Sequence, residues 1–494
     1  MRKQSNLILR SSIYMLLAVS AISCNKLVEV DEPIDSITAK KMYKNETQAE
    51  TALAGVYYEL INGYGTRPDP FLNSFAAGLS VYTSGLSSDE FNVSSANKPA
   101  YALAISKVTL TNYDFVTRIW NSAYHTIYNA NAVIEGIADA KNSSMRDSVK
   151  VQYTAEAKFL RAFCYFNLVN YFGELPIALT TDFNQTKSIA RSSVQTVYAQ
   201  ILSDLQDAER DLPAHYEAGK MERIRANSWV AKAMLAKVHL YMGNYPQAAA
   251  KASELIAQPG TFQMVPLSDV FLAPSKEAIF QLKQTNQGTD FRNATPQGFF
   301  FIPNDRYKDG AQLWLTDQLI SAFEAGDQRW EIWTDSTLQS NTGTTLKVWY
   351  PTKYKTGRYN AVLNAPSPEY TMVLRLAEMY LIRAEARANG ADGGHTKAIE
   401  DLNAVRLRTG LDGLSMGLDI EAVKEAVAHE RQIELFAEGG NRWFDLKRTG
   451  KASALLSSMP AKQPWEGDYQ LLYPIPVPEI EANRNILQNN GYIR

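Results

Sequence analysis

The feature that most constrains the fold is an alanine-rich helix–turn–helix pattern that occurs twice in the 494-residue sequence. In residues 231–248, alanines flank a turn at Gly243, and residues 376–398 follow the same plan around Gly390. Small side chains let two helices approach closely, and each pair leaves an apolar face that a neighbouring pair has to cover. The pattern therefore predicts helix pairs stacked into one scaffold rather than several independent domains.

The helix pairs resemble tetratricopeptide repeats, and helical periodicity extends well beyond them. Apolar residues recur at spacings of three and four over about 41–61, 116–257 and 370–450. We therefore predict a mostly α fold, in which a tetratricopeptide-like scaffold forms a single domain over residues 41–494.

Two long segments interrupt this periodicity. Residues 62–115 and 258–369 collect the glycines and prolines that end helices, and the tail over 457–494 contains a Pro-rich run that begins at Tyr473. We predict that the first two segments are loop-rich insertions and that the tail is loop-like.

The N-terminus has the pattern of an export signal. Positive residues precede an apolar run over 13–22, which is followed by Ser23-Cys24. Ten residues rise only about 15 Å as a helix, which is too short to cross a bilayer. A small residue before a cysteine is typical of a bacterial lipobox. We predict a lipoprotein signal peptide over 1–23, lipidation of Cys24 and a tether over 24–40, with an ordinary cleaved signal as the alternative.

Charge and composition exclude some classes of function. The 50 Lys and Arg against 52 Asp and Glu provide no basic excess, so no nucleic-acid partner is expected. If Cys24 is lipidated, Cys164 has no partner for an internal disulfide. The five His are scattered, so we expect no cofactor and no metal centre, and a structural Ca²⁺ stays an open alternative.

Two short enzyme-like motifs lack the context that catalysis needs. Gly413-Leu-Ser415-Met-Gly417 matches GxSxG, but a helix and a turn precede it where a nucleophile elbow requires a strand. His429-Glu430 begins an HExxH motif that ends in Ile433, so the second zinc ligand is missing. We interpret the first motif as a loop, name no catalytic residue and expect no enzyme activity.

Several segments, in order along the chain, resemble the signatures of the SusD/RagB family of surface glycan-binding lipoproteins. They are Glu156-Ala-Lys-Phe-Leu-Arg-Ala162 with Phe172-Gly-Glu-Leu-Pro176, Arg375-Leu-Ala-Glu-Met-Tyr-Leu-Ile-Arg-Ala-Glu-Ala386 with Leu402-Asn-Ala-Val-Arg-Leu-Arg408, Glu430-Arg-Gln-Ile-Glu-Leu-Phe-Ala-Glu438 with Arg442-Trp-Phe-Asp-Leu-Lys-Arg448, and Tyr473-Pro-Ile-Pro476. The matches run from Cys24 to Tyr492. We interpret the charged residues of 430–448 as a partly buried ion-pair network, with Arg431 beside Glu434.

The resemblance implies a function and a location. It implies that the protein is lipid-anchored to the outer membrane, faces the cell exterior, and binds oligosaccharides or polysaccharide fragments without cleaving them. It also implies a partner, a SusC-like TonB-dependent transporter that receives the glycan. Three alternatives remain open: a peptide-binding lid of a peptide importer, a structural tetratricopeptide adaptor, and a surface hydrolase.

The candidate binding residues follow from the chemistry of sugars. Sugar rings present flat apolar faces edged with hydroxyls, which aromatic planes and amide or carboxylate groups recognise. Loops on a rigid frame usually carry such groups. From the two insertions we select Tyr64, Tyr82, Asp89, Asn92, Tyr101, Asn286, Trp314, Trp349 and Tyr350.

The alternative is that these aromatic residues cover small cores within the insertions. Helix-like spacing favours this alternative for Trp314, Trp330 and Trp333. Tyr64 and the pair Trp349-Tyr350 fit both interpretations.

Overall fold

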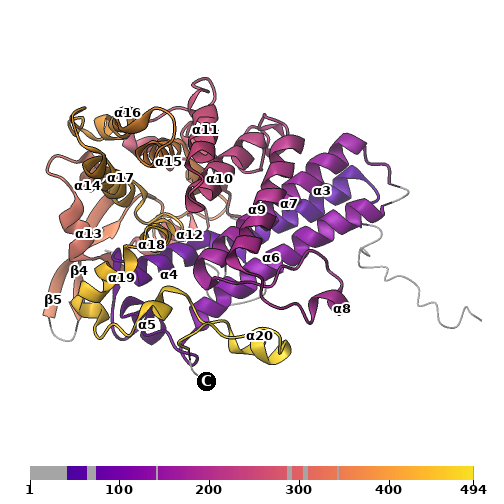
Figure 1. Cartoon of the computed structure of the whole chain (residues 1–494), viewed down its shortest axis with the longest axis horizontal. Coiled ribbons are helices and arrows are strands. Elements are labelled where there is room, and N and C mark those ends of the chain that lie inside the picture. The colour runs from indigo at the N-terminus through magenta and orange to yellow at the C-terminus, as the bar shows by residue number, and fades with distance from the viewer. Residues whose placement is uncertain are drawn as a thin grey trace, which may run out of the picture.

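The longest helices form one series in which each helix packs against the next (Figure 1). The computed structural model describes residues 42–63, 74–140, 143–285, 292–303, 310–341 and 344–492. The series consists of α3 (Glu46–Asn62), α6 (Asp114–Asp139), α7 (Asp147–Phe172), α9 (Val194–Asp211), α10 (Ser228–Tyr241), α11 (Tyr245–Ile256), α15 (Leu376–Ala388), α16 (Gly394–Arg406), α17 (Ile420–Leu435) and α18 (Asn441–Arg448). Short connecting helices are α8 (Phe183–Thr186), η4 (Glu217–Gly219) and η6 (Leu407–Thr409).

Small residues make the helix contacts of the two predicted pairs. Ala236 of α10 and Ala248 of α11 are fully buried where these helices meet. Gly243 (φ 73°) follows α10 and Gly390 (φ 98°) follows α15, both in the left-handed region that favours glycine. Helix α11 then packs directly on α15, although the whole second insertion lies between them in the sequence. The predicted mostly α fold with stacked helix pairs is confirmed.

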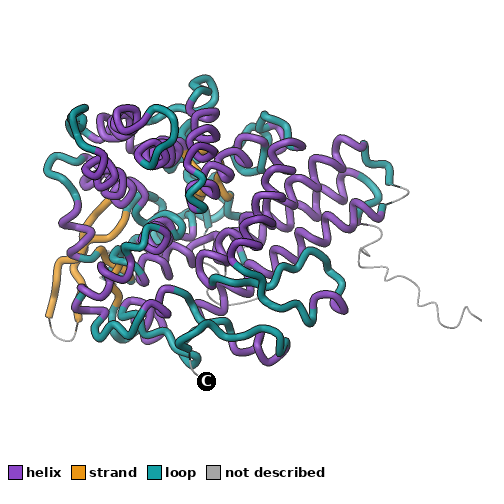
Figure 2. Tube along the Cα trace, viewed as in Figure 1, coloured by secondary structure: helices purple, strands orange, loops and turns teal. Residues whose placement is uncertain are grey.

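The insertions contain short helices and strands of three to eight residues rather than loops alone (Figure 2). The first carries η3 (Phe75–Leu79), α4 (Ser80–Ser87), β1 (Phe91–Val93) and α5 (Lys98–Ala104). The second carries η5 (Leu267–Asp269), β2 (Ala278–Leu282), α12 (Pro296–Phe301), β3 (Leu313–Leu315), α13 (Asp317–Ala322), α14 (Gln328–Trp333), β4 (Thr334–Asn341) and β5 (Thr344–Pro351), and β6 (Thr371–Arg375) follows it. The tail carries α19 (Ala452–Ser458), η7 (Pro460–Lys462), η8 (Asp468–Leu471) and α20 (Val477–Ala482).

Three antiparallel strand pairs organise the insertions. Strand β2 pairs with β6, which brings the first part of the second insertion next to the segment that directly follows the insertion. Strand β1 of the first insertion pairs with β3 of the second, and β4 and β5 form a hairpin that contacts β3. The hairpin lies at one end of the long axis of the molecule, opposite α3 (Figure 1). The two insertions therefore meet in one region.

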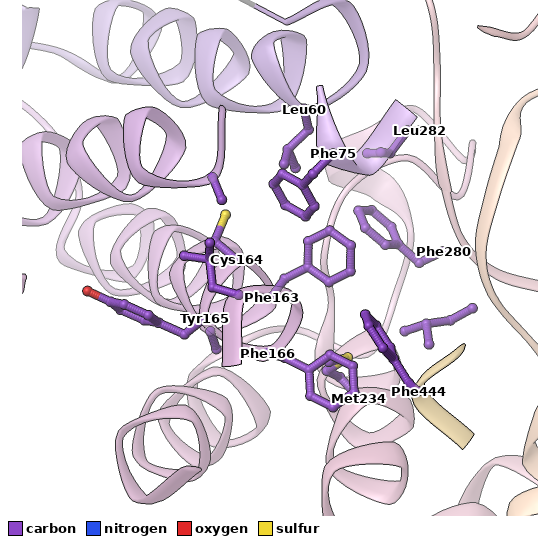
Figure 3. Close-up of a cluster of buried hydrophobic side chains, with 14 of the residues drawn as sticks. Leu60, Phe75, Phe163, Cys164, Tyr165, Phe166, Met234, Phe280, Leu282 and Phe444 are labelled. Carbon is purple, nitrogen blue, oxygen red and sulfur yellow. The ribbon is translucent and has the colours of Figure 1, made fainter. Parts of the chain in front are cut away.

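Both insertions contribute to the main hydrophobic core. Figure 3 shows Phe75 and Phe280, one from each insertion, beside Phe163 of α7 and Phe444 of α18. The Phe75 and Phe163 rings lie 5.7 Å apart. Full burial of such a side chain stabilises the fold by about 1.5–3 kcal/mol. The insertions are thus integral to the scaffold, which fixes the surface that they present.

The charged signature over 430–448 forms a buried ion-pair network, as predicted, with partners that its helical spacing does not reveal. Glu434 accepts hydrogen bonds from Arg375 at the end of β6 (2.6 Å) and from Arg329 of the second insertion (2.8 Å). Burial opposes ionisation of Glu434, but the neighbouring guanidinium groups lower its pKa below the ordinary value. Arg431 pairs with Asp445 at 2.7 Å instead of the expected Glu434. The network therefore fastens the second insertion to α17.

Some sequence predictions fall on residues that the structure leaves undescribed. Cys24, Tyr64 and Asn286 are among them, so lipidation and these two binding residues stay predictions. Across the described residues, no helix combines the length and apolar composition that a bilayer crossing requires. Cys164 is buried in α7 as a free thiol, and burial raises its pKa.

Candidate binding surface

Three of the predicted binding residues are buried, so the expectation that they face a ligand from exposed loops is wrong. Tyr82 is 1% exposed because its ring packs between Phe115 and Phe300, at 5.1 and 5.0 Å between ring centroids. Asp89 is 2% exposed and Tyr350 is 3% exposed. Their residue types suit sugar binding, but helix α4 buries Tyr82, the turn after α4 buries Asp89 and strand β5 buries Tyr350.

Asn92 and Trp314, in contrast, lie side by side on the outer face of a strand pair. They are directly opposite each other in the register of β1 and β3, which places their side chains on the same face about 5 Å apart. Both are half-buried, while the flanking residues of each strand are buried beneath them. An amide beside an indole is one of the combinations that sugar recognition requires.

Among the described residues, Trp314 packs against one small apolar cluster. The cluster is formed by Ala311, Val348 and Tyr350, the last two from β5. The predicted core role of Trp314 is thus correct for one side of the indole, and the remaining surface lies beside Asn92. A tryptophan that is fixed in this way loses little further conformational freedom when a ligand binds.

Trp349 lies on the opposite face of the hairpin and is half-buried. Its ring centroid is 4.5 Å from that of Trp330, at an interplanar angle of 49°. The ammonium group of Lys347 lies over the same indole, 4.7 Å from its centroid. The Trp349 indole is therefore already engaged by an aromatic and a cationic neighbour, and it is a poorer platform for a sugar than Trp314.

The other aromatic candidates are mainly structural. Tyr101 is half-buried in α5, which packs beside β1, and it contacts the main core. Trp333 is 1% exposed and donates its indole N–H to the carbonyl of Leu267 at 3.0 Å, which confirms the predicted core role.

Buried charges beneath β1 position the Asn92–Trp314 pair. The Asp89 carboxylate pairs with Arg442 of α18 at 2.7 Å, and the Thr316 hydroxyl donates to the Asp89 carbonyl. Glu90 accepts a hydrogen bond from the backbone N–H of Ala437 at 3.3 Å. Burial, reinforced by the nearby Asp89 carboxylate, raises the pKa of Glu90 to about 8. These contacts anchor both strands to the scaffold.

The sequence missed this anchor because its members are far apart in the chain. Asp89 was selected as a ligand contact, and Arg442 was assigned to the signature network. The one local signal is Thr316, which precedes α13 as an N-cap and accepts from the Leu319 N–H at 3.2 Å.

The enzyme-like motifs have structural surroundings. Residues 413–417 form the predicted loop, in which the Ser415 hydroxyl accepts a hydrogen bond from the Gly417 N–H at 3.3 Å. A ring nitrogen of His429 lies 2.7 Å from the carbonyl oxygen of Ala322. Among the described residues, no three His, Cys, Asp or Glu side chains are grouped as a metal site requires.

Comparison with known proteins places this geometry in a family. A family model described as "Starch-binding associating with outer membrane" matches residues 59–240, and the "SusD family" model matches residues 322–492. The chain belongs to the SusD/RagB family. The first matched range contains Asn92 and β1, whereas Trp314 and β3 lie between the two matched ranges.

Full-length relatives agree with this assignment. The SusD-like protein P25 of Formosa agariphila is 25% identical, with 97% of this chain and 98% of the relative aligned. A SusD superfamily protein from Bacteroides vulgatus shares the fold at a TM-score of 0.75 and 21% identity, covering 91% of this chain and 100% of the other. A laminarin-binding SusD-like protein matches at a TM-score of 0.73 and 26% identity, with 91% and 100% coverage. The resemblance seen in the sequence motifs is confirmed over nearly the whole chain.

Proposed function

We propose that this SusD/RagB member is a non-catalytic glycan-binding protein whose ligand contacts the Asn92–Trp314 pair. The observation that carries the proposal is the half-buried indole fixed beside an amide on the outer face of β1 and β3. The indole supplies a flat apolar surface for a pyranose ring, and the amide supplies a donor and an acceptor for its hydroxyls. The laminarin-binding relative supports a glycan ligand.

The wider role is also proposed from family membership. The protein is a lipoprotein of the outer membrane, anchored through Cys24, that captures an oligosaccharide outside the cell and passes it to a SusC-like TonB-dependent transporter. Such a handover requires moderate affinity, because a ligand that dissociates too slowly does not reach the transporter. No catalytic residue takes part.

The binding role is tested with soluble protein that lacks residues 1–23 and carries Cys24→Ser. Laminarin and starch oligosaccharides are titrated by calorimetry, with product analysis of each sample and a parallel panel of short peptides. We expect saturable binding of an intact glycan that Trp314→Ala weakens about tenfold, since one stacking contact contributes about 1.4 kcal/mol.

Phe183→Ala provides the matched control. Phe183 is an aromatic residue on α8 that is 72% exposed, and it lies outside both insertions. Its removal leaves glycan affinity unchanged if the Asn92–Trp314 pair is the site. Binding of peptides alone, cleavage of the glycan, or equal loss in both variants would each overturn the proposal.

The handover role needs the full-length lipidated protein in its own outer membrane. Affinity purification after detergent extraction is expected to recover a TonB-dependent transporter with it. The Cys24→Ser protein, which lacks the anchor, is the control for association that depends on the membrane. Recovery of the protein without a transporter would contradict the handover while leaving glycan binding standing.

A further inference from the structure

A cavity lies in the helical scaffold, apart from the Asn92–Trp314 surface. It has a volume of about 710 Å³ and is lined by residues of the α10–α11 turn, the end of α15, α17 and α18. Pockets of this size hold small organic ligands. No residue of β1 or β3 lines it, so it is a separate place for a ligand.

Two arginines and two carboxylates form a closed network along the cavity. Arg431 and Arg448 share Asp445, at 2.7 and 2.8 Å, and Arg448 also donates to Glu385 at 2.7 Å. Each carboxylate is thus fully engaged by guanidinium groups. The network holds the Arg431 side chain rigidly, with only 3% of its surface exposed.

Two hydrogen-bond donors of this lining have no acceptor among the residues that the structure describes. They are Nη1 of Arg431 and the hydroxyl of Tyr241, whose ring lies 5.0 Å below the Arg448 guanidinium. Buried arginine and tyrosine donors are almost always satisfied, because an unmade hydrogen bond to a buried group is costly. A ligand that satisfied these two donors would have to supply acceptor oxygens.

The charged residues around these two donors limit which chemical class of ligand can supply the acceptor oxygens. Lys451 also lines the cavity, is exposed and makes no ion pair with another described residue. Four acids lie in the same lining and would repel a doubly charged phosphate; they are Glu385, Glu421, Glu425 and Asp445. A carboxylate carries a single charge and two acceptor oxygens, which suits one guanidinium donor and one hydroxyl.

We propose that this cavity binds the carboxylate group of a small organic acid. One carboxylate oxygen accepts from Arg431 Nη1 and the other from the Tyr241 hydroxyl, while Lys451 attracts the anion from the rim. Both donors are covered by neighbouring side chains in the unliganded protein, so binding includes a small side-chain rearrangement of the kind common at interfaces. The acid is either a uronate sugar or the free carboxyl end of a short peptide.

The test uses the same soluble protein and matched pairs of probes. D-glucuronate is compared with D-glucose, and an N-acetylated dipeptide acid with its amide, by ligand-detected NMR at up to about 10 mM. We expect one acid of these pairs to bind and its neutral counterpart not to bind. The acid that binds identifies the source of the carboxylate.

Two conservative variants connect the binding to the cavity. Tyr241→Phe keeps the ring and removes only the hydroxyl, and it is expected to weaken binding about fivefold. Lys451→Gln is expected to weaken binding about twofold and to reduce its dependence on salt. Thermal unfolding checks that both variants remain folded.

Two controls separate this site from others. Lys397→Gln removes an exposed lysine of α16, paired with Glu400, that does not line the cavity, and it should leave binding unchanged. Trp314→Ala should also leave carboxylate binding unchanged, so failure of the glycan site and failure of this site are distinguishable. Absence of binding by both acids, equal binding of the neutral probes, or wild-type affinity in Tyr241→Phe would overturn the proposal.

Discussion

Trp314 and Trp349 belong to the same insertion and lie on neighbouring strands, yet their surroundings differ. Trp314 on β3 packs on one side against β5 and has an amide neighbour on its outer face. Trp349 on β5 is engaged by Trp330 and by the ammonium group of Lys347. Both side chains are half-buried, so exposure alone does not distinguish them.

The difference shows that the partners of an aromatic ring decide whether it can bind a sugar. A ring that already packs against an indole and a cation must lose those contacts before a sugar can replace them. A ring that is fixed from one side keeps its other surface free at no such cost. The comparison is the reason why we propose the β1–β3 pair, and not the indole cluster of the hairpin, as the glycan-binding surface.

The largest expected effect comes from breaking the anchor beneath Trp314. Arg442→Gln leaves the Asp89 carboxylate buried without its ion-pair partner, at 2% exposure. We expect the free energy of unfolding to fall by about 3 kcal/mol, measured by urea denaturation, and glycan affinity to fall with it.

Arg210→Gln is the control for loss of an arginine, since the Arg210 side chain is 64% exposed and pairs at the surface. It should leave both stability and glycan affinity unchanged. If Arg442→Gln were equally silent, the Asp89–Arg442 pair would not hold the strands, and the physical basis of the comparison would be lost.

The second prediction concerns the pH dependence of the same anchor. Burial raises the pKa of Glu90 from its ordinary value near 4.5 to about 8, so the folded protein favours the protonated form. The stability contributed by this proton is fully present below pH 4.5 and is lost as the pH rises toward 8. We expect Glu90→Gln to remove this decline and to raise the stability at pH 8 by on the order of 2 kcal/mol.

Urea unfolding of both proteins at pH 5 and pH 8 measures the effect. Glutamine retains an oxygen that can accept from the Ala437 N–H, so the hydrogen bond at 3.3 Å is preserved. Parallel stability curves for the two proteins between these pH values would show that Glu90 ionises normally in the folded state.

The third prediction compares alanine variants of the two tryptophans, Trp314 and Trp349. Trp314→Ala should weaken glycan binding about tenfold with a smaller effect on stability, because its outer surface is free to contact ligand. Trp349→Ala should leave affinity within about twofold but lower the free energy of unfolding by about 2 kcal/mol, since it removes the contact with Trp330. Calorimetric titration and urea unfolding of both variants test this contrast, and the reverse pattern would place the site on the hairpin.

The scaffold was predictable from the sequence because its signals are local. The alanines that make the helix contacts, Ala236 and Ala248, and the glycine of the turn, Gly243, lie close together in the sequence. The family signatures are also local signals, since their charged residues recur at helical spacing. Even there, the partners were not local: Glu434 pairs with Arg375 and Arg329 rather than with Arg431.

The candidate site was predictable only in part, because composition does not reveal which side of an element a residue faces. Tyr82 and Tyr350 have the residue type that sugar sites use, but the register of α4 and β5 places them in the interior. Asn92 and Trp314 became neighbours through a strand pairing between the two insertions, which no local pattern indicates. The anchor Asp89–Arg442 has the same long-range origin.

The smallest expected effect comes from removing the lysine that lies over the Trp349 indole. Lys347→Ala removes the ammonium group 4.7 Å from the Trp349 ring centroid and leaves Trp330 in contact with the indole. We expect easier quenching of tryptophan fluorescence by acrylamide and a change in glycan affinity below about twofold, because an exposed cation–π contact is weak and the site lies on the other strand pair. The double variant Lys347→Ala with Trp349→Phe should lack the quenching change, which assigns the signal to Trp349. A tenfold gain in affinity for Lys347→Ala would instead mean that Trp349 is the sugar platform and that Lys347 masks it.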